Sequence, residues 1–180
     1  MAKIEIKKKI CLLGGYGVGK TSLVRRFVYN KFEEKYLSTL GVHISKKKIK
    51  LRRNDNDSSI YVELFIWDIA NIEKFDLIVN NYLRGAHGAI IVSDISRPKT
   101  AESSSELLNK FLKVNNNAKY IFVGNKIDLI ANTEFDKDNF VSKIPNGKSH
   151  FHFASAKTGE NIEAIFSNLC LQLIEDFNSG

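Results

Sequence analysis

The stretch Gly14-Gly-Tyr-Gly-Val-Gly19-Lys20-Thr21 decides the fold of this chain. It matches the pattern G-x-x-x-x-G-K-[ST] in full, with an apolar run over residues 4–13 before it and a helix-forming segment after it. A tight glycine loop lets several backbone N–H groups point inward, and the helix N-terminus that follows adds partial positive charge. The sequence therefore predicts a phosphate-binding loop between a strand and a helix.

The residue types of this loop have distinct expected roles. Lys20 should reach the β- and γ-phosphates of a nucleotide and is a candidate catalytic residue, and the Thr21 hydroxyl should bind Mg²⁺. We expect the phosphates to contact residues throughout the loop and the start of the helix, namely Gly15, Gly17, Val18, Gly19, Lys20, Thr21 and Ser22. The pattern alone does not distinguish ATP from GTP.

The rest of the chain alternates apolar runs with segments of helical period, which predicts β-α units and a mostly parallel sheet. After the first strand, the predicted strands are residues 42–51, 60–67, 89–92, 120–123 and 151–153. The predicted helices are residues 20–30, a helix starting near residues 98–100, and residues 161–177. Turn-forming residues at 53–59 separate two of these strands, which should form a hairpin. The expected fold class is α/β, a three-layer P-loop NTPase fold with a six-stranded, mostly parallel sheet, one antiparallel edge strand and helices on both faces.

Length and composition favour one folded domain over residues 1–180. Cys11 and Cys170 both lie in apolar runs, so we expect two reduced core thiols and no disulfide framework. No stretch is long and apolar enough to span a bilayer, and the start Met-Ala-Lys-Ile-Glu lacks the apolar segment of a signal peptide. These features predict a soluble cytoplasmic protein.

The formal net charge is +7, and basic residues cluster at residues 7–9 and 46–53. Such clusters either line a solvated strand face or attract an acidic partner, an anionic membrane or nucleic acid. No nucleic-acid-binding motif accompanies the charge, so nucleic acid is not an expected partner.

A second motif, Asn125-Lys126-Ile-Asp128, follows the predicted strand 120–123. The Asp128 carboxylate can accept hydrogen bonds from the ring N–H and the amine of guanine, and adenine offers no such pair of donors. The Lys126 stem can lie over the base. Another loop closes the base site after the last predicted strand; it consists of Ser155, Ala156 and Lys157, and the Ala156 N–H would meet the guanine carbonyl oxygen.

With both motifs in place, residues 6–177 resemble the Ras superfamily of small GTPases and look closest to its Rab branch. The resemblance also rests on Phe32-Glu-Glu-Lys-Tyr36-Leu-Ser-Thr39-Leu-Gly41-Val42 and on Trp67-Asp68, which are similar to parts of the two Rab switch segments. It implies that Phe32 packs on the guanine edge and that Tyr36 covers the phosphates. It also implies that Thr39 binds Mg²⁺, senses the γ-phosphate and takes part in catalysis, and that Asp68 holds Mg²⁺ through water. The implied function is a switch that binds GTP or GDP with Mg²⁺ and meets effector and regulator proteins at its switch surface.

The second switch departs from the family pattern Trp-Asp-Thr-Ala-Gly-Gln-Glu. Ile72 stands where the family has the glutamine that orients the attacking water, which predicts GTP hydrolysis slower by roughly 10²–10³. Asn71 replaces a glycine whose N–H bonds the γ-phosphate, but it keeps that N–H and remains a predicted nucleotide-binding residue. Tyr16 fills a position that is small in the family, where its ring could obstruct an arginine finger or pack over the nucleotide.

Rab proteins usually end in a prenylated tail, whereas this sequence ends in Asn-Ser-Gly180 and has Ala at position 2. If the sequence is full length, we expect no encoded lipid anchor, and peripheral membrane contact only through a partner or the basic clusters; a shortened chain would explain the same ending. The leading hypothesis is a slowly hydrolysing GTPase switch. The alternative is a non-hydrolysing nucleotide-binding scaffold (a pseudoGTPase), and Asp128 argues against a third possibility, an ATP-using P-loop enzyme.

Overall fold

A computed structural model of the chain describes residues 4–33, 41–52, 59–70, 77–130, 134–144 and 150–175. The strands are β1 (Ile4–Leu13), β2 (Val42–Arg52), β3 (Ser59–Ile69), β4 (Gly88–Asp94), β5 (Lys119–Asn125) and β6 (Phe151–Ala154). The α-helices are α1 (Lys20–Tyr29), α2 (Leu77–Leu83), α3 (Lys99–Glu102), α4 (Ser104–Val114), α5 (Lys137–Ser142) and α6 (Ile162–Ile174), and a 3₁₀ turn, η1, spans Ile127–Leu129.

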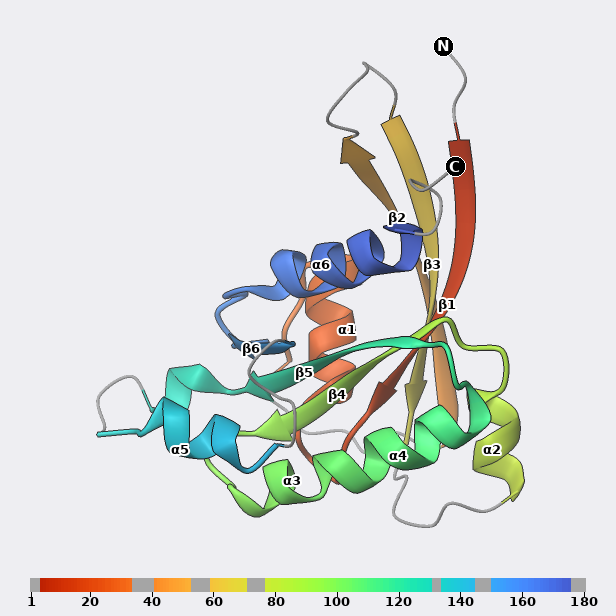
Figure 1. Cartoon of the computed structure of the whole chain (residues 1–180). Coiled ribbons are helices and arrows are strands. Elements are labelled where there is room, and N and C mark those ends of the chain that lie inside the picture. The colour runs from red at the N-terminus through yellow and green to blue at the C-terminus, as the bar shows by residue number, and fades with distance from the viewer. Residues whose placement is uncertain are drawn as a thin grey trace.

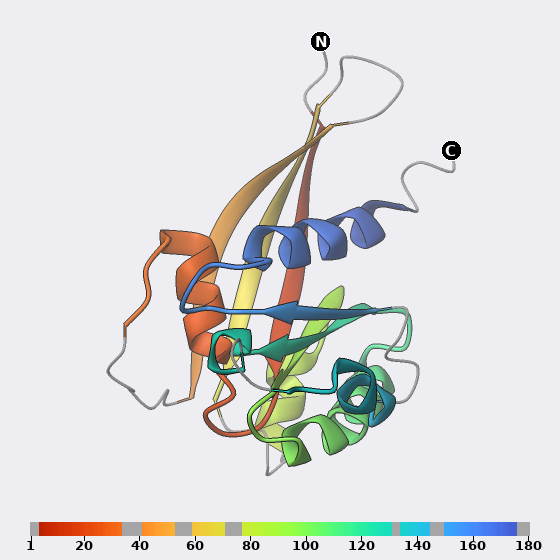
Figure 2. The same ribbon diagram turned by 90° about the vertical axis from the view of Figure 1, so that its left-hand side faces the viewer.

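The six strands form one sheet in the order β2-β3-β1-β4-β5-β6. Strand β2 pairs antiparallel with β3 at the edge of the sheet, and every other neighbouring pair is parallel. The predicted fold class, with a single antiparallel edge strand, is therefore confirmed. Figure 1 shows the helices on both sides of this sheet, and Figure 2 shows the same layers turned by 90°.

Two apolar layers hold the helices against the sheet. On one face, α1 and α6 pack over alternate residues of β1 and β3, and the rings of Phe27 and Phe166 stack with their centroids 3.7 Å apart. On the other face, α2, α3, α4 and α5 cover the remaining alternate residues, with Phe111 and Phe140 fully or almost fully buried. The period of two along each strand thus divides the apolar residues between two cores.

Both cysteines lie in these cores. Cys11 and Cys170 are free thiols with no exposed surface, and burial raises the pKa of each to about 12. The prediction of two reduced core thiols is therefore confirmed.

The element boundaries differ slightly from those predicted. Helix α1 ends at Tyr29 because Asn30 takes a left-handed conformation with φ 51°, and it caps the helix through its backbone N–H. Helix α6 spans Ile162–Ile174 and so begins one residue later than predicted, and the predicted residues 176–177 lie outside the described residues. The helices α2 and α5 were not predicted; α5 has six residues and begins where the Asp136 side chain accepts a hydrogen bond of 2.9 Å from the Asn139 N–H.

Strands β1, β2 and β3 extend well beyond the other three strands and past the end of α6 (Figures 1 and 2). The lysines of β2 point to alternating faces of the sheet. The Lys47 ammonium lies over the Phe27 ring, 3.9 Å from its centroid, donates to the Phe27 carbonyl, and forms an ion pair of 2.7 Å with Glu163. Lys46 and Lys48 project from the opposite face, so the basic run of residues 46–48 is not one surface.

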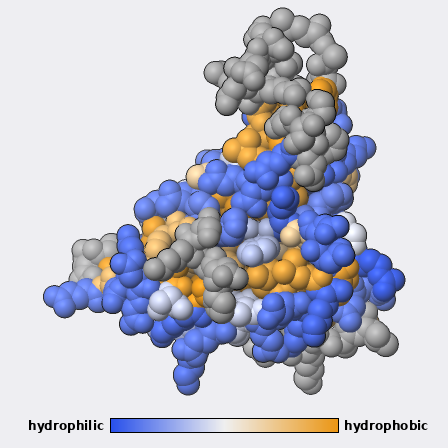
Figure 3. All heavy atoms as spheres, in the orientation of Figure 1, coloured by the Kyte–Doolittle hydropathy of each residue, from blue (hydrophilic) through white to orange (hydrophobic). Residues whose placement is uncertain are grey.

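The parallel strands bring their carboxyl ends to one edge of the sheet. The loops that follow β1, β4, β5 and β6 gather there, which is where ligands bind in sheets of this kind. In the view of Figure 3, hydrophilic atoms cover most of the surface, and apolar side chains form a band between α6 and α4. Within the ranges described above, no helix is long and apolar enough to cross a membrane.

Candidate functional site

The loop of residues 14–19 connects β1 to α1 and needs glycine at two positions. Gly14 has φ 149° and Gly19 has φ 97°, values that residues with a side chain rarely adopt. A Cβ at Gly14 would collide with the Val92 carbonyl oxygen of β4, and one at Gly19 would collide with the Asn125 amide. The loop is therefore held against the ends of two neighbouring strands.

Lys20 lies at the first position of α1 and is only 8% exposed. Its ammonium curls back over the loop and donates hydrogen bonds of 2.8 Å to the Gly14 carbonyl and 3.0 Å to the Gly15 carbonyl. The fixed cation therefore lies beside the loop that is predicted to bind phosphates.

Thr21 and Asp68 meet although they lie 47 residues apart. The Thr21 hydroxyl donates a hydrogen bond of 2.5 Å to Asp68 Oδ2, near the end of β3. Asp68 is 1% exposed, and its Oδ1 has no hydrogen-bond partner among the residues that the structure describes. Burial raises the pKa of the Asp68 carboxyl above its ordinary value, although the Thr21 hydrogen bond and the charge of Lys20 act in the opposite direction. The structure thus brings together two of the three predicted Mg²⁺-binding residues.

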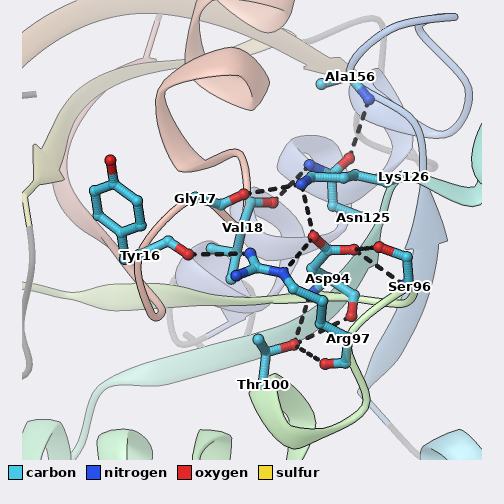
Figure 4. Close-up of polar contacts among 10 residues, drawn as sticks. All are labelled: Tyr16, Gly17, Val18, Asp94, Ser96, Arg97, Thr100, Asn125, Lys126 and Ala156. Carbon is cyan, nitrogen blue, oxygen red and sulfur yellow. Dashed lines mark hydrogen bonds and ion pairs between the residues drawn. The ribbon is translucent and has the colours of Figure 1, made fainter. Parts of the chain in front are cut away.

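Asn125 joins the phosphate loop to the base-site loop. Its buried amide donates 2.9 Å to the Val18 carbonyl, and its side-chain oxygen accepts 3.1 Å from the Ala156 N–H. Lys126 follows with φ 73°, and its ammonium donates 2.9 Å to the Gly17 carbonyl. Figure 4 shows Asn125 and Lys126 reaching the phosphate loop side by side.

The predicted base site has a short internal hydrogen bond. The Ser155 hydroxyl donates 2.5 Å to Asp128 Oδ1 and accepts 3.1 Å from the Thr158 N–H. The Arg26 guanidinium on α1 anchors the closing loop by donating 2.9 Å to the Ala156 carbonyl and 2.6 Å to the Lys157 carbonyl. The two halves of the predicted base site, after β5 and after β6, are therefore in direct contact.

Several predicted site residues lie outside the part of the chain that the structure describes. Tyr36 and Thr39 fall in the gap at residues 34–40, and Asn71 and Ile72 fall in the gap at residues 71–76. Phe32, which precedes the first gap, is half-buried and packs against the core beneath α1 and α6. The roles predicted for these residues remain predictions.

Three residues of the site were not predicted from the sequence. Asp94 ends β4 and binds both Lys126 and Arg97 through its Oδ2, while Arg26 holds the closing loop. A carboxylate directly after the buried run of β4 at the ligand-binding edge was a signal that could have identified Asp94. The two arginines act on backbone carbonyls far along the chain, for which the sequence has no pattern.

No group of three or more His, Cys, Asp or Glu side chains suited to a metal occurs in the described ranges. A site for Mg²⁺ does not require one, because this ion keeps several waters and usually takes one or two protein ligands together with substrate phosphates. Thr21 Oγ1 and Asp68 Oδ1, the latter without a hydrogen-bond partner in the described ranges, are oxygen ligands of the right chemistry. The residues present therefore fit Mg²⁺.

Comparison with known proteins identifies the family. The sequence model of the Ras family matches residues 9–175. The chain is 34% identical over 177 residues to the Ras-related protein Rab-1 of Theileria parva, covering 96% of this chain and 77% of that protein. It is 30% identical over 174 residues to the Ras-related protein RABC2b of Arabidopsis thaliana (95% and 82%), and 33% over 168 residues to the Ras-related protein Rab-13 of Canis lupus familiaris (92% and 79%). The chain belongs to the Ras family of small GTPases.

Proposed function

We propose that this small GTPase is a molecular switch that binds GTP and GDP together with Mg²⁺ and hydrolyses GTP slowly. The observation that carries the proposal is the Asn125 side chain, which bonds the phosphate loop at Val18 and the base loop at Ala156. One buried amide thus fixes the distance between a predicted phosphate site and a predicted base site. A nucleotide fits this spacing, because it has phosphates at one end and a base at the other.

The phosphate end is supported by charge and by loop geometry. The Lys20 ammonium is buried over the loop, and α1 begins directly behind it. A helix N-terminus and a desolvated cation both favour an anion. We assign phosphate contacts to the backbone of Gly15, Gly17, Val18 and Gly19 and to Lys20, Thr21 and Ser22.

The base end is supported by Asp128 and the loop that closes on it. Ser155 occupies Asp128 Oδ1 with one hydrogen bond, and a carboxylate has about four lone-pair sites, so it can still accept both guanine donors. The Ala156 N–H donates to Asn125, and a guanine carbonyl oxygen there would share that donor. Lys126 spans from the base loop to Gly17, which suits a stem lying over the base.

We assign Mg²⁺ to Thr21, Thr39 and Asp68. When bound, Mg²⁺ would supply positive charge that neutralises the charge of the phosphates, and these three side chains would hold it. The Asp68 carboxylate is held by Thr21 Oγ1, so the hydroxyl and the carboxylate are already adjacent. A bound cation would also compensate the buried Asp68 Oδ1, which has no hydrogen-bond partner among the described residues and whose burial is otherwise unfavourable.

Slow hydrolysis rests on Ile72, which has no group to orient an attacking water. The alternative, a scaffold that keeps its nucleotide without turnover, rests on Ile72 and Asn71 together. Purified protein distinguishes these functions when its bound nucleotide is released and separated by chromatography. Bound GDP that exchanges supports a cycling switch, retained GTP supports very slow turnover or a scaffold, and adenine nucleotide overturns the proposal.

Members of this family bind effector and regulator proteins generally, and we propose an acidic partner for the outer face of β2. This is the face opposite the one from which Lys47 contacts α1 and α6. Lys46, Lys48 and Lys50 lie on it and are exposed, although Lys48 forms an ion pair of 2.6 Å with Glu5. The half-buried rings of Phe65 and Tyr61 lie opposite Lys46 and Lys50 on β3. Reversing Lys46 and Lys50 to Glu should weaken binding of such a partner and flatten its salt dependence. Binding to phosphatidylserine vesicles would instead favour a membrane.

A further inference from the structure

Side chains hold the carbonyl oxygens along the phosphate loop. Lys20 bonds those of Gly14 and Gly15, and Asn125 bonds that of Val18. Between them, the carbonyls of Tyr16 and Gly17 accept hydrogen bonds from Arg97 Nη2 at 3.0 Å and from Lys126 Nζ at 2.9 Å. Arg97 is the only one of these four donors that neither the motifs nor the family resemblance indicated.

Arg97 and Lys126 share a single anion. Asp94 Oδ2 accepts 2.9 Å from Arg97 Nε and 2.6 Å from Lys126 Nζ, while Oδ1 accepts 3.0 Å from the Ser96 N–H and 2.6 Å from the Ser96 hydroxyl (Figure 4). Asp94 is 1% exposed, so its charge depends on these partners. Burial alone would raise the pKa of Asp94, but the hydrogen bonds from Lys126, Ser96 and Arg97 outweigh it and the pKa is lowered.

The turn after β4 places Arg97 where it can reach both partners. The Arg97 N–H donates 2.9 Å to the Asp94 carbonyl, and the Thr100 hydroxyl accepts 2.9 Å from the Asp94 N–H. The guanidinium therefore leaves a closed turn, with Nε directed to the carboxylate and Nη2 to the loop. A guanidinium has donors in this fixed fork, whereas a single ammonium does not.

The hydrogen bonds to these two carbonyls also fix the direction of the N–H groups in the same peptides. In a trans peptide the carbonyl and the N–H point in opposite directions. The Tyr16 carbonyl shares its peptide with the Gly17 N–H, and the Gly17 carbonyl shares its peptide with the Val18 N–H. Holding both carbonyls away from the centre of the loop turns both N–H groups toward it.

We propose that Asp94 and Arg97 are positioning residues of the nucleotide site: Asp94 holds Arg97 and Lys126 against the Tyr16 and Gly17 carbonyls, so that the Gly17 and Val18 N–H groups face the phosphates. The inference rests on the proposed nucleotide binding and adds two residues to it. Neither residue is assigned a ligand contact, and the effect of Arg97 falls on the phosphate end because its Nη2 bonds the Tyr16 carbonyl of the phosphate loop.

The test compares Arg97→Met with Lys110→Met. Each removes one cation from an ion pair, and the Lys110–Glu106 pair lies on α4, away from the loop. Two readouts are measured on the full chain: the dissociation rate of a fluorescent GDP, and amide hydrogen exchange of the peptide that contains residues 14–19. We expect R97M to release GDP about tenfold faster than K110M, as for loss of a charge-assisted hydrogen bond, and to exchange the loop amides faster.

A third readout separates positioning from a general loss of structure. The preference for GDP over inosine diphosphate depends on the base site, so it should stay unchanged in R97M, and R97K should recover only part of the slow dissociation. Equal GDP dissociation, or equal loop exchange, in R97M and K110M would overturn the inference. If wild type binds no GDP but R97M still exchanges its loop amides faster, the proposed function fails while the bracing role of Arg97 is supported.

Discussion

The Thr21 hydroxyl, in the first turn of α1, donates a hydrogen bond of 2.5 Å to Asp68 Oδ2 on β3. This contact joins the phosphate loop to the strand that leads into the second switch. The other carboxylate oxygen, Asp68 Oδ1, is buried without a partner among the described residues. The pair therefore has the chemistry of a cation site and also the cost of a buried charge.

We predict that Asp68→Asn abolishes most of the effect of Mg²⁺ on nucleotide retention. An amide lacks the charge that holds the hydrated ion. Removing Mg²⁺ with EDTA accelerates GDP release by some factor in each protein, and we expect this factor to be about tenfold smaller in the variant than in wild type. Without nucleotide, the variant should unfold at a temperature no lower than that of wild type, because it no longer buries a charge. An EDTA effect equal to that of wild type would contradict the assignment.

The base specificity leads to a second prediction, for Asp128→Asn. An asparagine amide can donate to a carbonyl where guanine has an amine, so the variant should prefer xanthosine diphosphate and lose GDP affinity by roughly 10⁴-fold. Equilibrium titration with fluorescent GDP and XDP measures both. Ser155→Ala is the matched control, because it removes a hydrogen bond to the same carboxylate without adding a donor for the base. An unchanged GDP preference in D128N would mean that the base lies elsewhere.

The parallel sheet and its ligand edge could be predicted because their signals are local. The phosphate loop must follow a strand and begin a helix, and the apolar runs of β4 and β5 are buried on both faces. Helices α2 and α5 gave no such signal, since they have seven and six residues and too few turns to show a helical period. The longer strands and helices could be predicted from the pattern of apolar residues within each segment, whereas the short helices contain too few residues to show such a pattern.

The support of the site could not be predicted in the same way. Arg97 acts on a carbonyl 81 residues away and Arg26 on one 130 residues away, and a backbone oxygen leaves no mark in the sequence. Lys47 is a different case. Successive side chains of a strand point to opposite faces of the sheet, so residue 47 must lie on the other face from residues 46 and 48. The separation of the basic run onto two faces was therefore predictable from the sequence.

A third prediction uses this division. Lys47→Met removes a cation from the buried Phe27 ring and a donor from its carbonyl, and should lower the free energy of unfolding by about 1–2 kcal/mol. Lys46→Met, on the exposed face, should change it by less than about 0.5 kcal/mol. Urea unfolding of both variants gives the comparison. Equal losses would show that the contacts of Lys47 contribute no more than an ordinary surface lysine.

The fourth prediction concerns pH and Asp94. Its pKa in the folded protein is lowered below the ordinary value of 3.8 by Lys126, Ser96 and Arg97 against the effect of burial. A lowered pKa means that ionised Asp94 stabilises the fold above its ordinary pKa, and that this stabilisation is lost as the pH falls through the folded pKa. The difference in unfolding free energy between wild type and Asp94→Asn should therefore be constant from about pH 5 to 7 and shrink below about pH 4. A difference that stays constant down to pH 3 would contradict this.

The last prediction tests the second switch directly. In Ile72→Gln a side-chain amide replaces a group that cannot bond water, and single-turnover hydrolysis of bound GTP should accelerate by roughly 10²–10³. Ile72→Leu is the control, because it keeps an apolar side chain of the same size and should leave the rate unchanged. If I72Q and I72L hydrolyse GTP at the same rate as wild type, the missing glutamine does not limit turnover. In that case Tyr16→Ser in the I72Q background tests whether the Tyr16 ring of the phosphate loop is the obstacle, since faster hydrolysis by this double variant would place the limit there.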